Sequence, residues 1–233
     1  MKTAAIILAA GRGSRMKSSL PKQYMELAGR PVLCHSVSAF AQSGVDEIVL
    51  VCTPGEEGHV RELCANDGCL SYIKSIVPGG SERVDSVECG LNATAAEYVL
   101  VHDGARPLIS SVVIKRCIAA VESHEAVCVG VPSKDTVKYT DDDRSVVDTP
   151  DRSRVWIAQT PQAFKRELLV SAYKNYDHTY IPTDDTGLVE KETGYSIYMV
   201  EGEYTNIKIT TPEDLGIAEL HYAHNARLSA DEE

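Results

Sequence analysis

Apolar runs with the length of buried strands alternate with helix-like periods along almost the whole chain, and this alternation constrains the fold most. The strand-like runs lie near residues 4–9, 47–52, 73–77, 98–102, 126–131, 155–159, 197–200 and 206–210. The helix-like periods lie near residues 32–42, 56–66, 82–95, 111–122, 165–175, 185–193 and 213–225. Because the strands are apolar without interruption, they predict a mostly parallel, doubly wound α/β sheet that is covered on both faces.

One segment, residues 133–154, departs from this alternation. It holds two short β-like pieces around an acidic turn, which predicts a β-hairpin arm that projects from the sheet. A lone hairpin is marginally stable in water, so we expect the arm to pack against another protein surface. A second subunit is the simplest candidate for that surface. Residues 1–225 are expected to form one domain, and the tail 226–233 is expected to be disordered.

The composition excludes several classes of protein. The chain has 233 residues and a net charge of −11, because 23 Lys and Arg residues face 34 Asp and Glu residues. Such an acidic chain is a poor candidate for binding nucleic acid or a membrane surface. No apolar run approaches the ~20 residues that a membrane-spanning helix needs, so a cytoplasmic location is expected.

Cysteine is frequent, with seven residues, an odd number. Most of them lie in apolar runs, and none forms a C-x-x-C pair. We therefore interpret them as small buried hydrophobic residues in a reducing compartment, not as metal ligands or disulfide partners.

The first strand-like run ends in a turn of small residues, LAAGRG over residues 8–13. Gly11 and Gly13 allow backbone N–H groups to approach a ligand closely, and two cations follow, Arg15 and Lys22. This combination suits a triphosphate, because the cations can stabilise developing negative charge. A turn that binds nothing is also common at this place, and neither a Walker A loop nor a dinucleotide fingerprint is present.

A second polar segment, HDGARP over residues 102–107, follows another strand-like run. Ligands of doubly wound sheets bind beyond the carboxyl ends of the strands, so Asp103 is expected to face the glycine turn. A carboxylate there is a natural Mg²⁺ ligand beside phosphate oxygens, although an Asx turn or a helix cap is the ordinary role of such an aspartate. Arg106 either contacts a phosphate or orients Asp103 through an ion pair.

Two more segments are expected at the same rim of the sheet. In VPGGSERVDS over residues 77–86, Gly80 would let backbone groups contact the edge of a base, and Ser86 could face the same site. In the apolar run 206–210, Lys208 needs an anionic partner, which is either a carboxylate or a substrate phosphate.

Taken in order, these segments resemble the 2-C-methyl-D-erythritol 4-phosphate cytidylyltransferase family of the non-mevalonate isoprenoid pathway. The similar segments cover nearly the whole chain: LAAGRGSRM…PKQY (8–24), GGSERVDSV (79–87), VHDGARP (101–107), VPSKDTVK (131–138), QTPQAF (159–164), TDDTGLVE (183–190) and YTNIKITTPEDL (204–215). The resemblance implies a Rossmann-like nucleotidyltransferase fold. It also implies transfer of a cytidylyl group from CTP to methylerythritol phosphate, with Mg²⁺ and with release of pyrophosphate.

The same resemblance implies roles for individual residues. Arg15 and Lys22 would be the catalytic cations, and Asp103 the metal-binding carboxylate. The nucleotide would be bound by Ala9, Ala10, Gly11, Gly13, Gly80, Ser86 and Asp103. The polyol phosphate would be bound by Thr136, Arg152, Thr183 and Lys208, with Arg106 as a further substrate contact. Thr136 and Arg152 flank the arm, which in the family crosses to the partner subunit, so a homodimer with shared active sites is implied.

Two alternative functions stay open. The first is a ribitol 5-phosphate cytidylyltransferase, which uses the same loop and reaction, and the HDGARP run modestly favours the isoprenoid enzyme over it. The second is a non-catalytic nucleotide-binding regulator. The presence of Arg15, Lys22 and Asp103 together argues against that second alternative.

Overall fold

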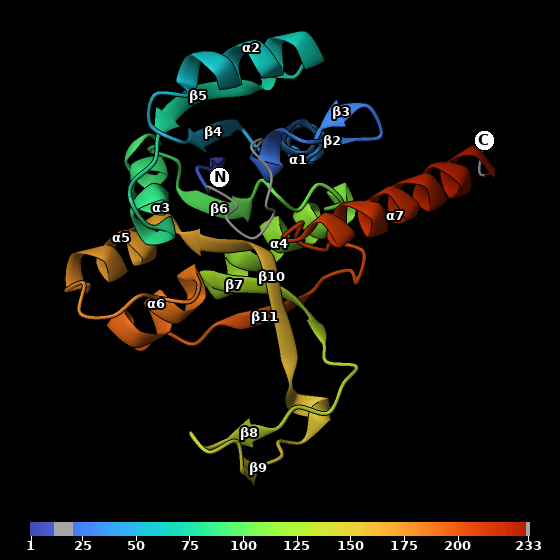
Figure 1. The fold of residues 1–233 in the computed structure, drawn as a ribbon. Helices are drawn as coiled ribbons and strands as arrows, with labels where there is room; N and C mark the ends of the chain where they lie inside the picture. The colour runs from blue at the N-terminus through green and yellow to red at the C-terminus, as the bar shows by residue number, and fades with distance from the viewer. Residues whose placement is uncertain (12–20, 232–233) are drawn as a thin grey trace.

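A seven-stranded sheet in the order β11-β7-β10-β6-β1-β4-β5 forms the centre of the structure, a computed structural model that describes residues 1–11 and 21–231 (Figure 1). Its strands are β1 (Thr3–Ala9), β4 (Glu47–Cys52), β5 (Ile73–Pro78), β6 (Tyr98–Asp103), β7 (Ala126–Pro132), β10 (Trp156–Lys165) and β11 (Tyr198–Glu201). Adjacent strands of this sheet are parallel except where β10 pairs with β6 and β7. The mostly parallel sheet that the alternation predicts is confirmed.

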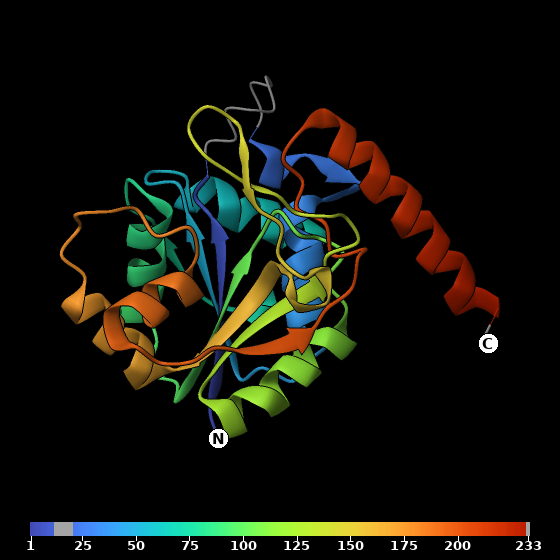
Figure 2. The same cartoon turned by 90° about the horizontal axis from the view of Figure 1, so that it is seen from below.

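Helices cover both faces of the sheet, as the uninterrupted apolar strands predict. One layer consists of α1 (Val32–Ala41), α2 (Glu57–Asp67) and α4 (Ser111–His124), and the other of α3 (Arg83–Asn92), α5 (Arg166–Asn175) and α6 (Asp185–Thr193) (Figure 2). In β1, Ala5 and Ile7 pack in the core of the first layer, whereas Ala4 and Ile6 pack in the core of the second. All four are fully buried, so alternate side chains of one strand enter two separate cores.

Shorter elements lie between these strands and helices. The two-residue strands β2 (Glu26–Leu27) and β3 (Arg30–Pro31) follow the 3₁₀ turn η2 (Lys22–Tyr24), and a second such turn, η3 (Leu70–Tyr72), precedes β5. Across the described ranges, no helix combines the length and the apolar character needed to cross a membrane.

Residues 206–210 are not a strand, so that part of the prediction is wrong. Ile207 and Ile209 instead pack in a third, smaller apolar cluster with Leu27 and with α7 (Pro212–Asp231). The apolar pattern of the segment is therefore satisfied outside the sheet. α7 itself continues to Asp231, beyond residue 225 where the pattern predicted its end.

β10 is longer than the predicted strand near 155–159, because it continues through the polar residues 160–162 to Lys165. Its polar side chains are buried with partners: Gln162 Oε1 accepts hydrogen bonds from the backbone N–H groups of Asp185 and Thr186, at 3.0 and 3.1 Å. Thr160 Oγ1 accepts a hydrogen bond from the backbone N–H of Asp103 at 3.1 Å. Hydrogen-bonded polar groups can be buried in a strand, which a hydropathy pattern does not reveal.

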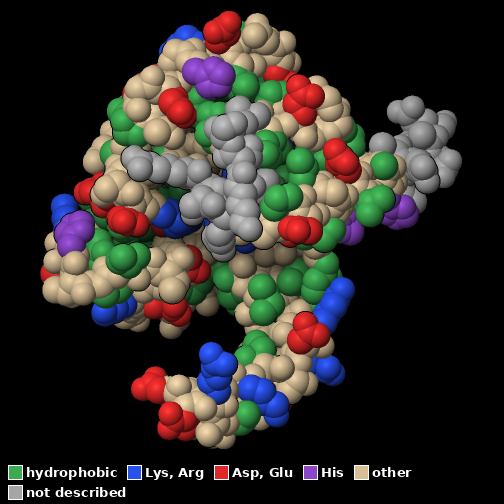
Figure 3. All heavy atoms as spheres, in the orientation of Figure 1, with side chains coloured by type: hydrophobic (Ala, Val, Ile, Leu, Met, Phe, Trp, Pro, Cys, Tyr) green, Lys and Arg blue, Asp and Glu red, His purple; other side chains and the backbone are tan. Residues whose placement is uncertain are grey.

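The predicted arm is present. β8 (Tyr139–Thr140) and β9 (Val146–Asp148) pair antiparallel in a sheet of their own, and the turn η4 (Arg152–Arg154) leads back into β10. Residues 138–149 are all exposed, and Figure 3 shows a hollow between the arm and the body of the molecule. Exposed apolar side chains on the arm, such as Val146 and Val147, suit packing against a second surface.

A substitution at Gly90 tests how closely α3 packs against the sheet. A Cβ at this position would lie 2.4 Å from Ile6 Cγ2 and 3.0 Å from Val51 Cγ2. We expect Gly90→Val to lower the free energy of unfolding by about 1–3 kcal/mol, measured by denaturant titration, because the added atoms overpack the core. Gly58→Val is the matched control, since no atom lies within 4 Å of a Cβ added at that position in α2. A loss no larger than that of the control would contradict this packing.

Candidate active site

The carboxyl ends of β1, β4, β5 and β6 meet around a cavity of about 620 Å³. The described residues that line it are Leu8, Ala9, Ala10, Gly11, Lys22, Gln23, Thr53, Pro54, Gly79, Gly80, Ser81, Glu82, Arg83, Ser86, Asp103, Ala105 and Lys208. This is the rim at which doubly wound sheets bind ligands, and the volume is typical of small-molecule sites. The structure therefore joins in one cavity the segments that the sequence assigned to this rim.

One wall of the cavity is a tight junction between the start of α3 and the turn after β1. A Cβ on Gly79 would lie 2.6 Å from Ser86 Oγ and 2.9 Å from Ala10 Cβ. Ser86 Oγ accepts a hydrogen bond from the backbone N–H of Gly80 at 3.2 Å and donates one to Glu82 O at 3.1 Å. Side chains larger than hydrogen do not fit at Gly79 without movement, so backbone forms this wall.

Asp103, at the end of β6, lies among three cations. Lys208 Nζ is 2.7 Å from its Oδ2, Arg83 Nε is 3.4 Å from its Oδ1, and Arg106 Nε is 3.7 Å from its Oδ2. Burial alone would raise the pKa of Asp103, but the charges of Arg83 and Lys208 outweigh burial and hold this pKa well below its usual range. The carboxylate is therefore ionised at neutral pH.

Arg83 connects Asp103 to α6. Its two terminal nitrogens donate hydrogen bonds to both carboxylate oxygens of Asp185, at 2.9 and 2.8 Å. Asp185 is buried at the start of α6, and the bidentate pair fixes the plane of the guanidinium group. Three cations thus face two carboxylates, Asp103 and Asp185, so the cluster keeps a surplus of positive charge beside the cavity.

His102 and Thr160 support the strand end that carries Asp103. Thr160 Oγ1 lies 3.0 Å from His102 Nδ1 and accepts a hydrogen bond from the backbone N–H of Asp103. His102 is fully buried, and burial lowers its pKa to about 3, so the imidazole is neutral near neutral pH. These neutral side chains hold the end of β6, and therefore Asp103, in place without adding charge to the site.

A second cavity of about 410 Å³ adjoins the first, and Lys208 lines both. Its lining also includes Arg106 and Lys134, which lies at the root of the arm. Arg106 Nη1 donates a hydrogen bond to Asn206 O at 2.8 Å, while its buried Nε has no hydrogen-bond partner. Arg106 also forms an ion pair with Asp103, and because it lines the second cavity, a phosphate contact stays open as its second role.

The structure brings together most, but not all, of the predicted site residues. The first cavity is lined by Ala9, Ala10, Gly11, Lys22, Gly80, Ser86, Asp103 and Lys208, and the second by Arg106 and Lys208. Arg15 and Gly13 lie outside the described residues. Thr136 and Arg152 are exposed on the arm, and Thr183 is exposed just before α6. These three line neither cavity of their own chain.

The sequence reasoning missed three residues that organise the site: Gln23, Arg83 and Asp185. Gln23 is buried, and its Nε2 donates hydrogen bonds to Ala9 O at 2.7 Å and Gly11 O at 3.2 Å, which fixes the base of the glycine turn. Arg83 and Asp185 are 102 residues apart, so no spacing rule could join them. The available signal was weak: Arg83 lies in the segment 77–86 that was expected at the rim, whereas Gln23 and Asp185 lie in segments indicated only by the family resemblance.

A divalent cation could be held by Asp103. Its Oδ2 has the short contact to Lys208, whereas its Oδ1 has the longer contact, 3.4 Å to Arg83 Nε. Oδ1 therefore fits a hard cation that takes one protein carboxylate and obtains its other ligands from phosphates and water.

A doubly wound sheet with β10 antiparallel, and a cavity lined by cations at its strand ends, are the features expected of a nucleotidyltransferase of the Rossmann-like class, and comparisons with known proteins show that class. The profile of the family described as 2-C-methyl-D-erythritol 4-phosphate cytidylyltransferase (IspD) matches residues 3–223. The chain belongs to this family, and the resemblance drawn from its segments is confirmed.

Individual relatives agree with this assignment. The chain is 50% identical over 222 residues to the 2-C-methyl-D-erythritol 4-phosphate cytidylyltransferase of Lachnoclostridium phytofermentans, which covers 94% of this chain and 95% of the relative. It is 44% identical over 224 residues to the protein of the same name from Caldanaerobacter subterraneus subsp. tengcongensis, covering 94% and 98%. The crystal structure of 4-diphosphocytidyl-2C-methyl-D-erythritol synthase from Anaerococcus prevotii is 36% identical, with a TM-score of 0.83 over 95% of this chain and 98% of that one.

A substitution at Asp185 tests whether its ion pair with Arg83 stabilises the protein. We expect Asp185→Asn to lower the free energy of unfolding by about 1–3 kcal/mol, because Arg83 loses a charged partner in a partly buried place. Chemical denaturation measures this loss. Asp177→Asn is the matched control, since Asp177 is exposed and accepts hydrogen bonds from Thr179 within its own turn. Equal stability of the two variants would show that the Arg83 pair does not stabilise the site.

Proposed function

We propose that this chain transfers the cytidylyl group of CTP to 2-C-methyl-D-erythritol 4-phosphate and releases pyrophosphate. The observation that carries the proposal is the cationic cluster around Asp103, which lies in the same cavity as the glycine turn and the backbone wall at Gly79. Such a cavity suits a nucleoside triphosphate, with its base against the wall and its phosphates beside the cations. The names of the relatives supply the identity of the two substrates.

The reaction needs positioning and charge stabilisation more than covalent help from a side chain. A phosphate oxygen of the polyol phosphate forms a bond to the α-phosphorus of CTP. The bond between that phosphorus and the oxygen leading to the β-phosphate breaks, and pyrophosphate leaves. Lys22, which lines the cavity, and Arg15 stabilise the charge that develops on the phosphates. Lys208 lines both cavities and can hold the attacking phosphate beside the nucleotide.

Mg²⁺ belongs to this proposal, with Asp103 as its protein ligand. When bound, the ion would supply positive charge to the triphosphate oxygens. Arg83 and Lys208 keep the carboxylate of Asp103 ionised at neutral pH, and a bound ion would have to share that carboxylate with them.

The polyol phosphate site is proposed to be completed by a second copy of this chain. Thr136 and Arg152 are exposed on the arm and line neither cavity of their own chain. The second cavity reaches the root of that arm at Lys134 and Asp135, and Arg152 Nη1 donates a hydrogen bond to Lys134 O at 3.3 Å. In a homodimer that exchanges arms, Thr136 and Arg152 of one copy would complete the site of the other, and Thr183 would add a contact from the segment just before α6.

Pyrophosphate release tests the reaction. CTP and Mg²⁺ are supplied with either 2-C-methyl-D-erythritol 4-phosphate or ribitol 5-phosphate, and ATP, GTP and UTP replace CTP as controls. Turnover is expected with CTP and the branched polyol phosphate. Turnover with ribitol phosphate alone would move the chain to the alternative cytidylyltransferase, and CTP binding without any turnover would favour the non-catalytic regulator.

Lys22→Ala is expected to lower kcat by roughly 10²-fold or more, because the ammonium group stabilises charge in the transition state. Lys115→Ala, an exposed change on α4, is the matched control. Steady-state kinetics with both substrates separates the two parameters. A change in KM with kcat unchanged would reject the transition-state role of Lys22.

A mixture of Lys22→Ala and Arg152→Ala proteins is expected to recover part of the activity that each variant lacks. Recovery arises because a mixed dimer would contain one site with both residues intact if the arms cross between subunits. Activity is measured after subunit exchange, which is followed with a labelled chain. Proven exchange without recovery would contradict shared sites.

A further inference from the structure

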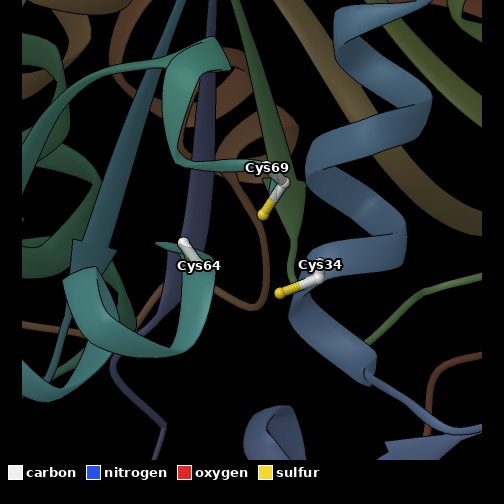
Figure 4. Close-up of side chains that lie close together, drawn as sticks. All are labelled: Cys34, Cys64 and Cys69. Carbon is white, nitrogen blue, oxygen red and sulfur yellow. The ribbon is translucent and has the colours of Figure 1, made fainter. Parts of the chain in front are cut away.

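Three cysteines from separate segments meet in the core, and none of them lines either cavity. Cys34 belongs to α1, Cys64 to α2, and Cys69 to the turn before η3 (Figure 4). One sulfur from each lies within 4.8 Å of the other two. The three residues are 0, 0 and 2% exposed, and all three are free thiols. The fold therefore creates a cluster that the spacing of the cysteines did not indicate.

The geometry of this three-thiol cluster is close to that of a coordination site. Sulfurs bound to one ion through bonds of about 2.3 Å lie about 3.5–4 Å apart, whereas these three lie within 4.8 Å of one another, so the sulfurs need to approach by at most about 1.3 Å. Each thiol gives up its proton when it binds an ion.

The number of ligands limits which ion fits. Among the described residues, no His, Asp or Glu joins the three thiols as a fourth ligand. Structural Zn²⁺ sites take four protein ligands, so three thiols alone are incomplete for Zn²⁺. Hard cations are excluded because they prefer oxygen ligands. A soft ion that accepts three sulfur ligands remains.

The charge of the complex limits the ion further. The neighbouring cation, Arg30, is already paired with Asp67 at 2.7 Å. A monovalent ion such as Cu(I) with three thiolates would leave two uncompensated negative charges in the core, which burial strongly disfavours. A trivalent ion with three thiolates is neutral and carries no such penalty.

We propose that Cys34, Cys64 and Cys69 form a three-thiolate site for a trivalent, thiophilic metalloid, for which arsenite is the probe. In the binding step, As(OH)₃ reacts with three thiols. Three As–O bonds break and three As–S bonds form, and the thiol protons leave with the hydroxyl groups as three water molecules. No oxidant or reductant takes part. The bound ion would link α1, α2 and the segment before β5 covalently.

Arsenite titration of the reduced, folded wild-type protein tests the site. We expect one arsenic per chain by native mass spectrometry, a rise in Tm, and three sulfur neighbours by X-ray absorption at the arsenic edge. The X-ray measurement needs no variant, so it holds even where a substitution prevents folding. Two sulfur neighbours with one oxygen, or no stoichiometric binding by the folded protein, would overturn the proposal.

Single substitutions then assign the ligands. Cys34→Ala, Cys64→Ala and Cys69→Ala should each weaken arsenite binding at least 10-fold, whereas Cys117→Ala should leave it unchanged. Cys117 is the matched control because it is fully buried in the same core cluster but lies outside the three-thiol cluster. Equal weakening by Cys117→Ala would contradict the assignment. Displacement of arsenite by equimolar Zn²⁺ or Cu(I) would overturn the choice of a trivalent ion.

Discussion

The arrangement of the site depends on one buried carboxylate. Asp103 interacts with Lys208 from the segment before α7, with Arg83 from the start of α3, and with Arg106 from its own loop. Arg83 extends these contacts to Asp185 and thereby to α6. A single ionised group therefore fixes the end of β6 relative to α3 and α6, which belong to one helical layer, and relative to the segment before α7. The same contacts leave a surplus of positive charge where a polyphosphate would bind.

Periodicity was sufficient to predict the sheet, because each buried strand must be apolar on both faces. It failed where burial has another cause. Residues 206–210 have the pattern of a strand but bury their isoleucines against α7, and residues 159–162 look polar but are buried with hydrogen-bonded partners. Both errors have the same origin. A hydropathy pattern indicates whether a side chain is apolar, but a segment forms a strand only if the backbone of another strand lies beside it.

Much of the site could also be predicted, because the carboxyl ends of parallel strands meet at one rim whatever their order in the sequence. That rule placed Gly11, Gly80 and Asp103 together without any contact being known. It could not supply Gln23, whose role depends on where its amide ends in space, nor the Arg83–Asp185 pair, whose members are far apart in the chain. The three-thiol cluster is of the same kind, since its sulfurs come from α1, α2 and the turn before η3, which only the fold brings together.

Lys208 lines both cavities and is bonded to Asp103 in this structure. An anion that enters either cavity competes with Asp103 for the same ammonium group, so its arrival changes the charge that the other cavity presents. Occupancy of the two cavities is thus thermodynamically linked. The linkage is reciprocal: if a ligand in one cavity changes the affinity of the other cavity by some factor, a ligand in the second cavity changes the affinity of the first by the same factor.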